Sequence, residues 1–499
     1  MLDNLRSAFK STLIYGLGSL SIKLVGFVLL PLYTKYIPVS DYGILALVES
    51  LSQIIVTVFS FNLTLALFRW YWDTRYIQKQ KTIFFTALVF SVAVAIGLVL
   101  VIFPFTSTIS NLLFERTDWS HLLKLMALFS AMEIIISIPA TLMRLQEKAG
   151  LYAITQIIRL MVNLVSAVIL LVYINRSVES IYIAQLIGST VYFLVLLPYF
   201  LKNIKIHFET QILKEMLAYA IPTVIGSISI LLVSFADRYL LKYFGVLADV
   251  GLYSLGVKIA NIILFVVMSI QMAIAPLIYK TIDRPESKRF FSKIMTYLAF
   301  FIMFLVLGVS FFGRETVKVL ARNPDYWSAY HVIPFLAFGI FFYTLKEMAN
   351  TGLVVARNTK RMALITTLMS GLNVLLDILI IPHLQTIGAA IAIMITQLCY
   401  LFIVYRFSQK AYPIQYEVIK LIKVTLLGIS LVLLSECANE LSSVLRVFVK
   451  ILLLCFYPLL LYFMRFYEDI ELLRLEQAWK KWKHPHQWRK ILRLFTAIV

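Results

Sequence analysis

Apolar stretches long enough to cross a lipid bilayer follow one another from residue 11 to about residue 466. A helical span needs roughly 20 apolar residues to match a hydrocarbon core about 30 Å thick. Backbone polar groups find no water in that core, so each span has to satisfy them within a helix. The sequence therefore predicts an all-α polytopic membrane protein with about fourteen transmembrane helices, at residues 11–36, 42–67, 83–110, 120–143, 152–174, 180–201, 215–241, 250–279, 290–313, 329–354, 362–382, 386–406, 418–438 and 442–465.

The composition excludes several classes of function. Hydrophobic residues make up 61% of the 499 residues and charged residues 14%, whereas a soluble domain is about half apolar and a quarter charged. No polar stretch has room for a separate catalytic domain, and no GxxxxGK[ST] phosphate loop is present. Cysteines and histidines show no ligand spacing, so no metal site is expected. We expect no catalytic residues, no enzyme activity and no nucleic acid partner, despite the net charge of +20.

Lysine and arginine in the short loops predict the orientation of the chain. They are concentrated on the side that carries Arg69, Arg75, Lys79 and Lys81 in one loop, and residues 280–293 in another. Because cytoplasmic loops are enriched in positive charge, this side is predicted to be cytoplasmic. An even number of spans then places both termini in the cytoplasm, in a multi-pass protein of the cytoplasmic membrane.

The chain also contains an internal repeat. The segment KYIPVSDYGILAL from Lys35 to Leu47 is similar to KYFGVLADVGLYSL from Lys242 to Leu255, and Asn163 recurs as Asn373. The offset of 207 to 210 residues covers six spans, which predicts parallel repeats related by an axis along the membrane normal. The predicted parts are an N-lobe at 1–208, a C-lobe at 209–412 around a central cavity, two additional spans at 413–466, and a tail at 467–499.

Five predicted spans carry a basic residue on a polar stripe with helical spacing. An ionisable group inside a membrane is costly and usually faces a hydrated cavity or a partner. Lysine and arginine would bind an anionic substrate group such as a phosphate. The candidate cavity residues are Lys23, Arg159, Arg238, Lys258 and Lys346, together with Asn163 and Asn261.

The acidic residues in the spans support two interpretations. Each carboxylate can form an ion pair with a basic residue, and the adjacent Asp237 is a candidate partner that would neutralise Arg238. A carboxylate without a partner could instead bind a coupling proton or sodium ion. Glu133 has no basic residue on its own stripe and is the first candidate for this role, with Glu49 and Asp377 as alternatives. No bound cofactor is expected, and coupling to a proton gradient, a sodium gradient or the membrane potential stays open. The candidates for either role are Glu49, Glu133, Asp237, Glu347 and Asp377.

The segments GLGSLSIKLVGFVLLPLYTKYIPVSDYGILAL and SFADRYLLKYFGVLADVGLYSLGVKIANI carry a family resemblance. They resemble the polysaccharide-transporter branch of the multidrug/oligosaccharidyl-lipid/polysaccharide exporter superfamily, which includes Wzx-type flippases. The pair Asp237–Arg238, Gly245 and the GLYSLG segment are its most specific elements. The resemblance implies translocation of an undecaprenyl-pyrophosphate-linked oligosaccharide from the inner to the outer leaflet, by alternating access through a cationic cavity. It points to Lys23, Asp237–Arg238 and Lys258 as site residues.

Other functions remain as alternatives. Fourteen spans also resemble the lipid II flippase of peptidoglycan synthesis, and the same superfamily includes cation-coupled multidrug exporters. A membrane-embedded glycosyltransferase, ligase or acyltransferase would need a large loop or a His/Asp/Glu constellation, and neither is visible. The tail combines Trp479, Trp482 and Trp488 with lysine and arginine, which predicts an amphipathic helix on the anionic cytoplasmic surface. A polymerase or glycosyltransferase of the same pathway is a further candidate partner.

Overall fold

The computed structural model describes residues 26–281, 286–356 and 358–473, and every regular element in these ranges is a helix. Within these ranges, twelve helical segments are long and apolar enough to cross a bilayer. The predicted all-α polytopic membrane fold is therefore confirmed. The long helices are α3 (Val39–Phe59), α5 (Gln80–Phe114), α6 (Ser120–Leu145), α7 (Ala149–Ile169), α8 (Val178–Lys202), α9 (Thr210–Phe244), α10 (Leu247–Thr281), α11 (Ser287–Phe311), α13 (Ile333–Ala349), α15 (Thr359–Ala411), α16 (Val418–Cys437) and α17 (Ser443–Phe463).

Shorter helices connect or extend these spans. The first predicted span lies mostly outside the described residues, and only its end is described, as α2. Two predicted spans, 362–382 and 386–406, form the limbs of α15, which meet at Gln385 with φ 47° and ψ −124°. The short elements are α2 (Leu30–Tyr36), α4 (Leu63–Trp70), η1 (Thr74–Lys79), η2 (Leu170–Ile174), α12 (Gly313–Leu320), η3 (Pro324–Val332), α14 (Thr351–Val355) and η4 (Ala438–Glu440).

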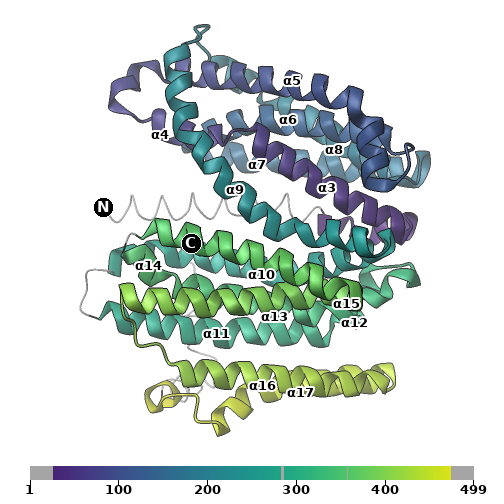
Figure 1. Cartoon of the computed structure of the whole chain (residues 1–499), viewed down its shortest axis with the longest axis vertical. Coiled ribbons are helices and arrows are strands. Elements are labelled where there is room, and N and C mark those ends of the chain that lie inside the picture. Colours follow the sequence, from purple (N-terminus) through teal and green to yellow (C-terminus); the bar gives the residue numbers. More distant parts are fainter. Residues whose placement is uncertain (1–25, 282–285, 357, 474–499) are drawn as a thin grey trace, which may run out of the picture. The chain divides into compact units, whose positions relative to one another are not determined.

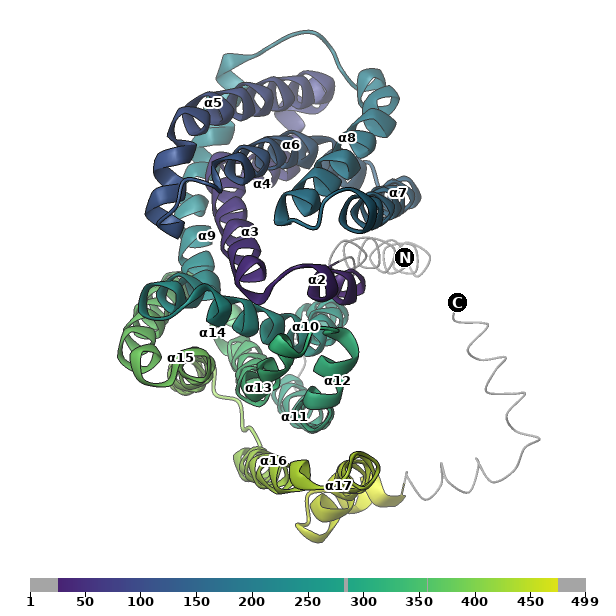
Figure 2. The same cartoon turned by 90° about the vertical axis from the view of Figure 1, so that its right-hand side faces the viewer.

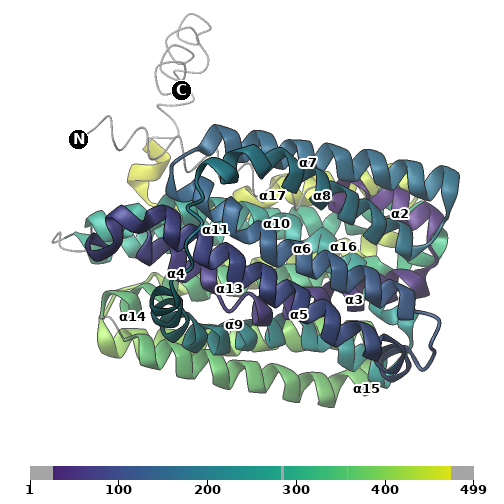
Figure 3. The same ribbon diagram turned by 90° about the horizontal axis from the view of Figure 1, so that it is seen from above.

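Contacts divide the described chain into two compact units. The first unit contains α2 to α10 and α12 to α15, and the second contains α11, α16 and α17. Within the first unit, α5, α6, α7 and α8 pack together with α3 and α4, and Figure 3 shows their long axes running roughly parallel. A second group, α10, α13, α14 and α15, also packs together. We call these the N-group and the C-group.

Helix α9 belongs to both groups. Its first half supplies Ile212, Met216 and Ala220 to the buried core of the N-group. The helix also packs against α15, where the hydroxyl of Ser370 donates to the carbonyl oxygen of Ser229 at 3.3 Å. In Figure 1, α9 runs obliquely from α4 toward the C-group. A movement of one group against the other therefore has to bend or tilt this helix.

The N- and C-groups also meet where α3 crosses α10. A Cβ atom on Gly43 would lie 2.0 Å from the carbonyl oxygen of Leu247, and one on Gly251 would lie 2.3 Å from the carbonyl oxygen of Val39. In the repeat, Gly251 corresponds to Gly43 and Leu247 corresponds to Val39, both at an offset of 208 residues. The contact is thus reciprocal, as a two-fold relation between the halves requires. Small residues allow two membrane helices to approach this closely.

Equivalent hydrogen bonds in the two halves support the same relation. The amide of Gln156 in α7 donates to the hydroxyl of Tyr192 in α8 at 3.3 Å. At the corresponding positions in α15, the hydroxyls of Thr366 and Tyr400 lie 2.5 Å apart. The α7–α8 pair and the two limbs of α15 are therefore the same antiparallel hairpin, repeated once along the chain.

The second predicted span is broken. Helix α3 ends at Phe59 and α4 begins at Leu63, because Phe61 (φ 50°) and Asn62 (φ 49°) adopt left-handed backbone conformations. The amide of Asn62 donates to Thr223 and Ser227 of α9 at 3.0 Å each. These side-chain bonds across helices hold a backbone conformation that non-glycine residues rarely adopt, and the continuous apolar pattern gave no sign of the break.

In the second unit, α11 packs against α16 and α17, which lie side by side in Figure 2. An ionic cluster joins the ends of these helices. Lys293 of α11 forms ion pairs with Glu468 and with Glu417, the latter at 2.8 Å. Glu417 also accepts a hydrogen bond from Thr296 at 2.7 Å and forms an ion pair with Lys420 at 3.0 Å. Although burial raises the pKa of Glu417, hydrogen bonds from Lys293, Thr296 and Lys420 lower it to about 2.

This shift predicts a loss of stability in acid. Glu417 stabilises the folded unit fully above its ordinary pKa of about 4.3, and that contribution disappears as the pH falls toward about 2. We expect the thermal midpoint of the wild type to exceed that of Glu417→Gln at pH 6, and the difference to shrink between pH 5 and pH 2. The exposed Glu286→Gln is the control, and a difference independent of pH would contradict the prediction.

Candidate functional site

Charged and polar side chains line the contact between α3, α9 and α10. Lys258 Nζ of α10 lies 3.4 Å from Glu49 Oε2 of α3, and 5.1 Å from the centroid of the Tyr42 ring. Both charged side chains are about one-quarter exposed. The predicted cavity residue Lys258 is therefore placed between the two groups, with a carboxylate and an aromatic face as its neighbours.

Arg238 of α9 lies in the same contact region but has no carboxylate within ion-pair distance among the described residues. Its guanidinium donates to Ser254 Oγ at 3.3 Å and to the carbonyl of Ser234 at 2.9 Å, and lies 5.0 Å from the Phe235 ring. The neighbouring Asp237 turns away, toward Tyr253. Asp237 and Arg238 therefore form no side-chain ion pair, although the two charges still interact electrostatically.

A second basic residue, Arg159 of α7, lies within the N-group. Its guanidinium forms an ion pair with Glu133 of α6 and donates to Ser189 of α8 at 2.9 Å. Ser189 also donates to Glu133 at 3.2 Å, and the Tyr192 ring lies 5.5 Å from the guanidinium. Glu133 thus has the role of an ion-pair partner, and the three helices α6, α7 and α8 are tied together by this triad.

Removing one member of the triad should destabilise the protein. Arg159→Met leaves the Glu133 carboxylate without its cation, which costs about 3 kcal/mol for a buried pair. We expect the thermal midpoint in detergent to fall for Arg159→Met and to recover largely in Arg159→Met/Glu133→Leu. If the double variant regains stability but not transport, the pair has a role in transport besides its structural one. If the single and double variants have equal thermal midpoints, the pair is not purely structural.

Lys346 of α13 is buried in the C-group. It forms an ion pair with the adjacent Glu347, and its ammonium lies 4.4 Å from the Tyr343 ring and 4.6 Å from the Tyr400 ring. Cation–π contacts of this kind stabilise a desolvated cation. Lys346 and Glu347 are therefore placed together, as partners for each other.

A buried acidic cluster lies between α9, α10 and α15. Asp237 accepts hydrogen bonds from the hydroxyl of Tyr253 and from the backbone amide of Arg238, the latter at 2.7 Å. Asp377 is fully buried, neither of its carboxylate oxygens has a hydrogen-bond partner among the described residues, and it interacts electrostatically with Asp237. A buried carboxylate without a partner is costly, so Asp377 needs a proton or a cation.

Further oxygen atoms lie next to Asp377. Asn373 precedes Asp377 by one helical turn and is 1% exposed, and its side-chain oxygen likewise has no partner in the described chain. Its amide donates to Thr396 on the other limb of α15 at 3.4 Å. Carboxylate, amide and hydroxyl oxygens are hard ligands that suit a proton or an alkali cation and not a soft transition metal.

The repeat shows that this arrangement is specific to the C-group. Asn163 of α7 corresponds to Asn373, but Ala167 occupies the position of Asp377, and Gly188 occupies that of Thr396. A Cβ atom on Gly188 would lie 3.2 Å from Asn163 Cβ, so the corresponding helices are in close contact. The N-group therefore has the amide but lacks the carboxylate and the hydroxyl.

Lys23 and most of the C-terminal tail lie outside the described residues, and Asn261 is half-buried on α10. The sequence interpretation missed Asn373 and Thr396 as neighbours of Asp377. The one-turn spacing of Asn373 and Asp377 could have indicated the first, whereas Thr396 required knowledge of the hairpin.

Comparison with known proteins agrees with the fold. Residues 8–282 match the family model described as polysaccharide biosynthesis protein, which is more than half of the chain. The chain belongs to the polysaccharide biosynthesis protein family. The predicted membership of the polysaccharide-transporter branch of the exporter superfamily is thus confirmed, and residues 222–379 also match the MatE model.

Two proteins of known sequence are similar over part of their length. The Lsg locus putative protein 1 of Haemophilus influenzae is 25% identical over 56% of this chain and 67% of its own length. An uncharacterized membrane protein of Methanocaldococcus jannaschii is 25% identical over 39% of each chain.

Solved structures show the same fold at low identity. The lipid II flippase MurJ in an inward closed conformation aligns with a TM-score of 0.70 and 16% identity, over 89% of this chain and 98% of that one. A multidrug resistance MATE family transporter in an inward-facing conformation aligns with a TM-score of 0.63 and 12% identity, over 77% and 94%. The family and the fold are those of multi-pass membrane transporters and flippases, not those of enzymes.

Proposed function

We propose that this protein is a flippase that moves an undecaprenyl-pyrophosphate-linked oligosaccharide, a repeat unit of a surface polysaccharide, from the inner to the outer leaflet of the cytoplasmic membrane. The observation that carries the proposal is the guanidinium of Arg238, which donates hydrogen bonds to Ser254 and Ser234 and forms no ion pair with any described residue. A cation at such a position that no ion pair holds is available to an anion that joins it during the working cycle. A diphosphate is the anion that this family's substrates would supply.

The neighbouring residues provide further contacts for such a head group. Lys258 lies one helical turn beyond Ser254, which accepts a hydrogen bond from Arg238. When the N- and C-groups move apart, Lys258 would leave Glu49 and bind the substrate instead. Arginine binds phosphate oxygens in a bidentate manner and lysine acts as a point charge. The sugars would cross between hydrated polar walls while the isoprenoid tail stays in the lipid, so that ATP is not needed in this chain.

Alternating access is the mechanism that fits this arrangement. The contact between Gly43 and Gly251 would act as the point about which the N- and C-groups tilt, and α9 would change its bend. We further propose that binding of a proton or a sodium ion at Asp377, Asp237 and Asn373 sets the preferred state, since these residues lie between α9, α10 and α15. The membrane potential would then act on the bound charge.

The orientation and partners follow the same proposal. Both termini would face the cytoplasm, as the distribution of lysine and arginine in the loops indicates. The lipid-linked glycan would be received from glycosyltransferases on that side, and a polymerase of the pathway would accept it on the other.

Depletion of the protein in its own host tests the function. Lipid-linked sugars are then quantified on each leaflet. Accumulation of an undecaprenyl-pyrophosphate oligosaccharide on the cytoplasmic side, with loss of a surface polymer, is the expected result. Accumulation of lipid II would assign the protein to peptidoglycan synthesis, and normal intermediates with increased sensitivity to toxic cations would indicate a multidrug exporter; both outcomes overturn the proposal.

Complementation with variants tests the role of Arg238. Arg238→Ala should reduce flux about tenfold or more, the effect of losing one charge-assisted phosphate contact, whereas Arg238→Lys should retain most of it. The exposed Arg116→Ala is the matched control. Equal flux in Arg238→Ala and the control, at equal amounts of inserted protein, would exclude Arg238 as an anion contact.

A further inference from the structure

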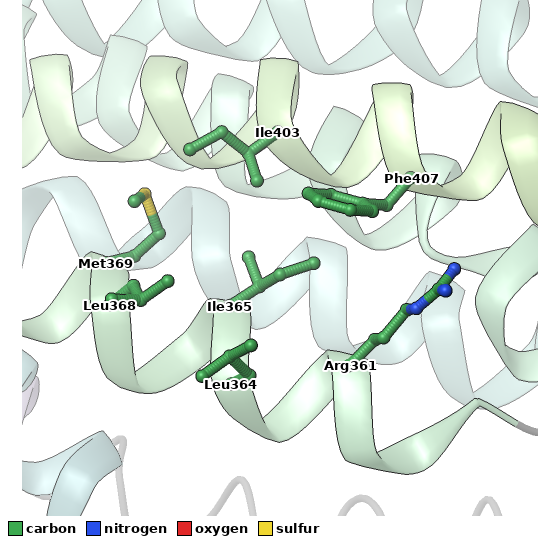
Figure 4. Close-up of a pocket in the computed structure, with 7 residues that line it drawn as sticks. All are labelled: Arg361, Leu364, Ile365, Leu368, Met369, Ile403 and Phe407. Carbon is green, nitrogen blue, oxygen red and sulfur yellow. The ribbon is translucent and has the colours of Figure 1, made fainter.

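A groove lies on the hairpin formed by the two limbs of α15. It has a volume of about 140 Å³ and is lined by six apolar side chains and by Arg361. Figure 4 shows Ile403 and Phe407 on one limb opposite Ile365 and Arg361 on the other, with Met369 and Leu368 at the far end. Leu364 is 60% exposed and Leu368 is 59% exposed, so the groove is open to the surroundings of the helices, which in a membrane are lipid chains.

The groove is polar at one end only. The Arg361 guanidinium lies 6.0 Å from the centroid of the Phe407 ring, at the end where the first limb begins and the second limb ends. The other basic residues at this end, Lys360, Arg406 and Lys410, are exposed as well, and none of the four has an ion pair within the described ranges. The single acidic residue of α15, Asp377, is about 24 Å further along the helix.

This combination of charge and shape identifies a class of ligand. A volume of about 140 Å³ accommodates part of one hydrocarbon chain, whereas a phospholipid carries two chains joined through glycerol. In a polyprenyl phosphate or diphosphate, a single chain is attached directly to the phosphate. The ligand's anion and its first apolar segment therefore lie next to each other, as Arg361 and the apolar wall do.

We propose that this groove binds the isoprenoid chain of a polyprenyl-diphosphate lipid next to its head group, with the phosphate at Arg361; the assignment of this lipid rests on the proposed function. From Arg361 to Leu368 the groove follows the limb for about 10 Å, so it holds only the part of the chain nearest the phosphate. The repeat places Leu151 of α7 at the position of Arg361, and the cation at the corresponding N-group hairpin is instead Lys148, which lies 4.9 Å from the Tyr199 ring. All lining residues of the groove belong to α15, so the groove is separate from the Arg238 region.

A photoreactive polyprenyl diphosphate, with a diazirine in its first isoprene unit, tests the site. The full-length protein is placed in nanodiscs of phosphatidylethanolamine and phosphatidylglycerol, irradiated, digested and mapped by mass spectrometry. We expect labels within residues 361–369 and 403–407, about tenfold less labelling for Arg361→Ala, and little loss for Arg361→Lys. Leu364→Trp should fill the groove and reduce labelling, while Leu379→Trp, an exposed leucine on the same limb but outside the groove, should not.

Two results would overturn the proposal. Labels that avoid both segments would exclude the groove as the site, and displacement by excess phosphatidylglycerol as readily as by unlabelled polyprenyl diphosphate would show a general binding site for anionic lipids. The depletion experiment fails or succeeds independently of these results. Specific labelling in a protein whose depletion leaves lipid-linked sugars unchanged would retain the binding site and refute the flippase function.

Discussion

Gly43→Ala is expected to destabilise the protein by about 3 kcal/mol or more and to abolish transport. The added methyl group would lie 2.0 Å from the carbonyl oxygen of Leu247, a backbone atom that cannot move aside as a flexible side chain would. Overfilling a packed contact costs about 1–3 kcal/mol when side chains can adjust, and here α3 and α10 would have to separate. Thermal unfolding in detergent and complementation of the depleted host measure the two effects.

The glycines of the chain provide matched controls. Gly97 in α5 and Gly308 in α11 are also helical, but a Cβ atom at either position has no neighbour within 4 Å. Alanine there should leave stability unchanged or raise it by up to about 1 kcal/mol, since glycine is a poor helix former. Gly251→Ala should behave like Gly43→Ala, because its methyl group would meet Val39. A tolerated Gly43→Ala would mean that the two helices do not form this contact.

Asp377→Asn is expected to reduce flux about 100-fold and to remove its dependence on the coupling ion. Coupling free energies between two sites are about 1–3 kcal/mol, which corresponds to 5–150-fold, and Asp377 supplies two of the oxygen atoms that have no other partner in the described chain. Asparagine has a similar shape, so the fold should be retained. Flux in proteoliposomes under an imposed sodium or proton gradient is the measurement, with the exposed Asp118→Asn as the control.

Ion binding can be followed without transport. A cation that binds the folded state raises the thermal midpoint in proportion to the logarithm of its concentration above Kd. If sodium is the coupling ion, the wild type should be stabilised by sodium but not by choline, and Asp377→Asn should be stabilised by neither. If a proton is used instead, the wild-type flux should depend on pH and not on sodium. Wild-type flux that is unaffected by both gradients would refute ion coupling at this cluster.

The sequence was a good guide to what depends on local pattern. Apolar length predicted the helical spans and the membrane class, because each span has to satisfy its backbone within itself and match the bilayer by its own length. The repeat from Lys35 to Leu47 and from Lys242 to Leu255 predicted the duplicated arrangement, and Gly43 and Gly251 form its reciprocal contact. Helical spacing also indicated that the basic residues of the spans share a helix face with other polar side chains.

Only the tertiary structure decided which charges neutralise each other. Glu133 and Arg159 are 26 residues apart and form an ion pair across two helices, whereas Asp237 and Arg238 are adjacent and point to different partners. Consecutive residues of a helix point about 100° apart, so neighbours in sequence lie on different faces. Partners on other helices depend on the rotation of each helix, which packing of small and large side chains sets and a linear pattern does not contain. The sequence favoured Glu133 as the ion site and gave Asp377 as an alternative, whereas the fold pairs Glu133 with Arg159 and leaves Asp377 without a hydrogen-bond partner among the described residues.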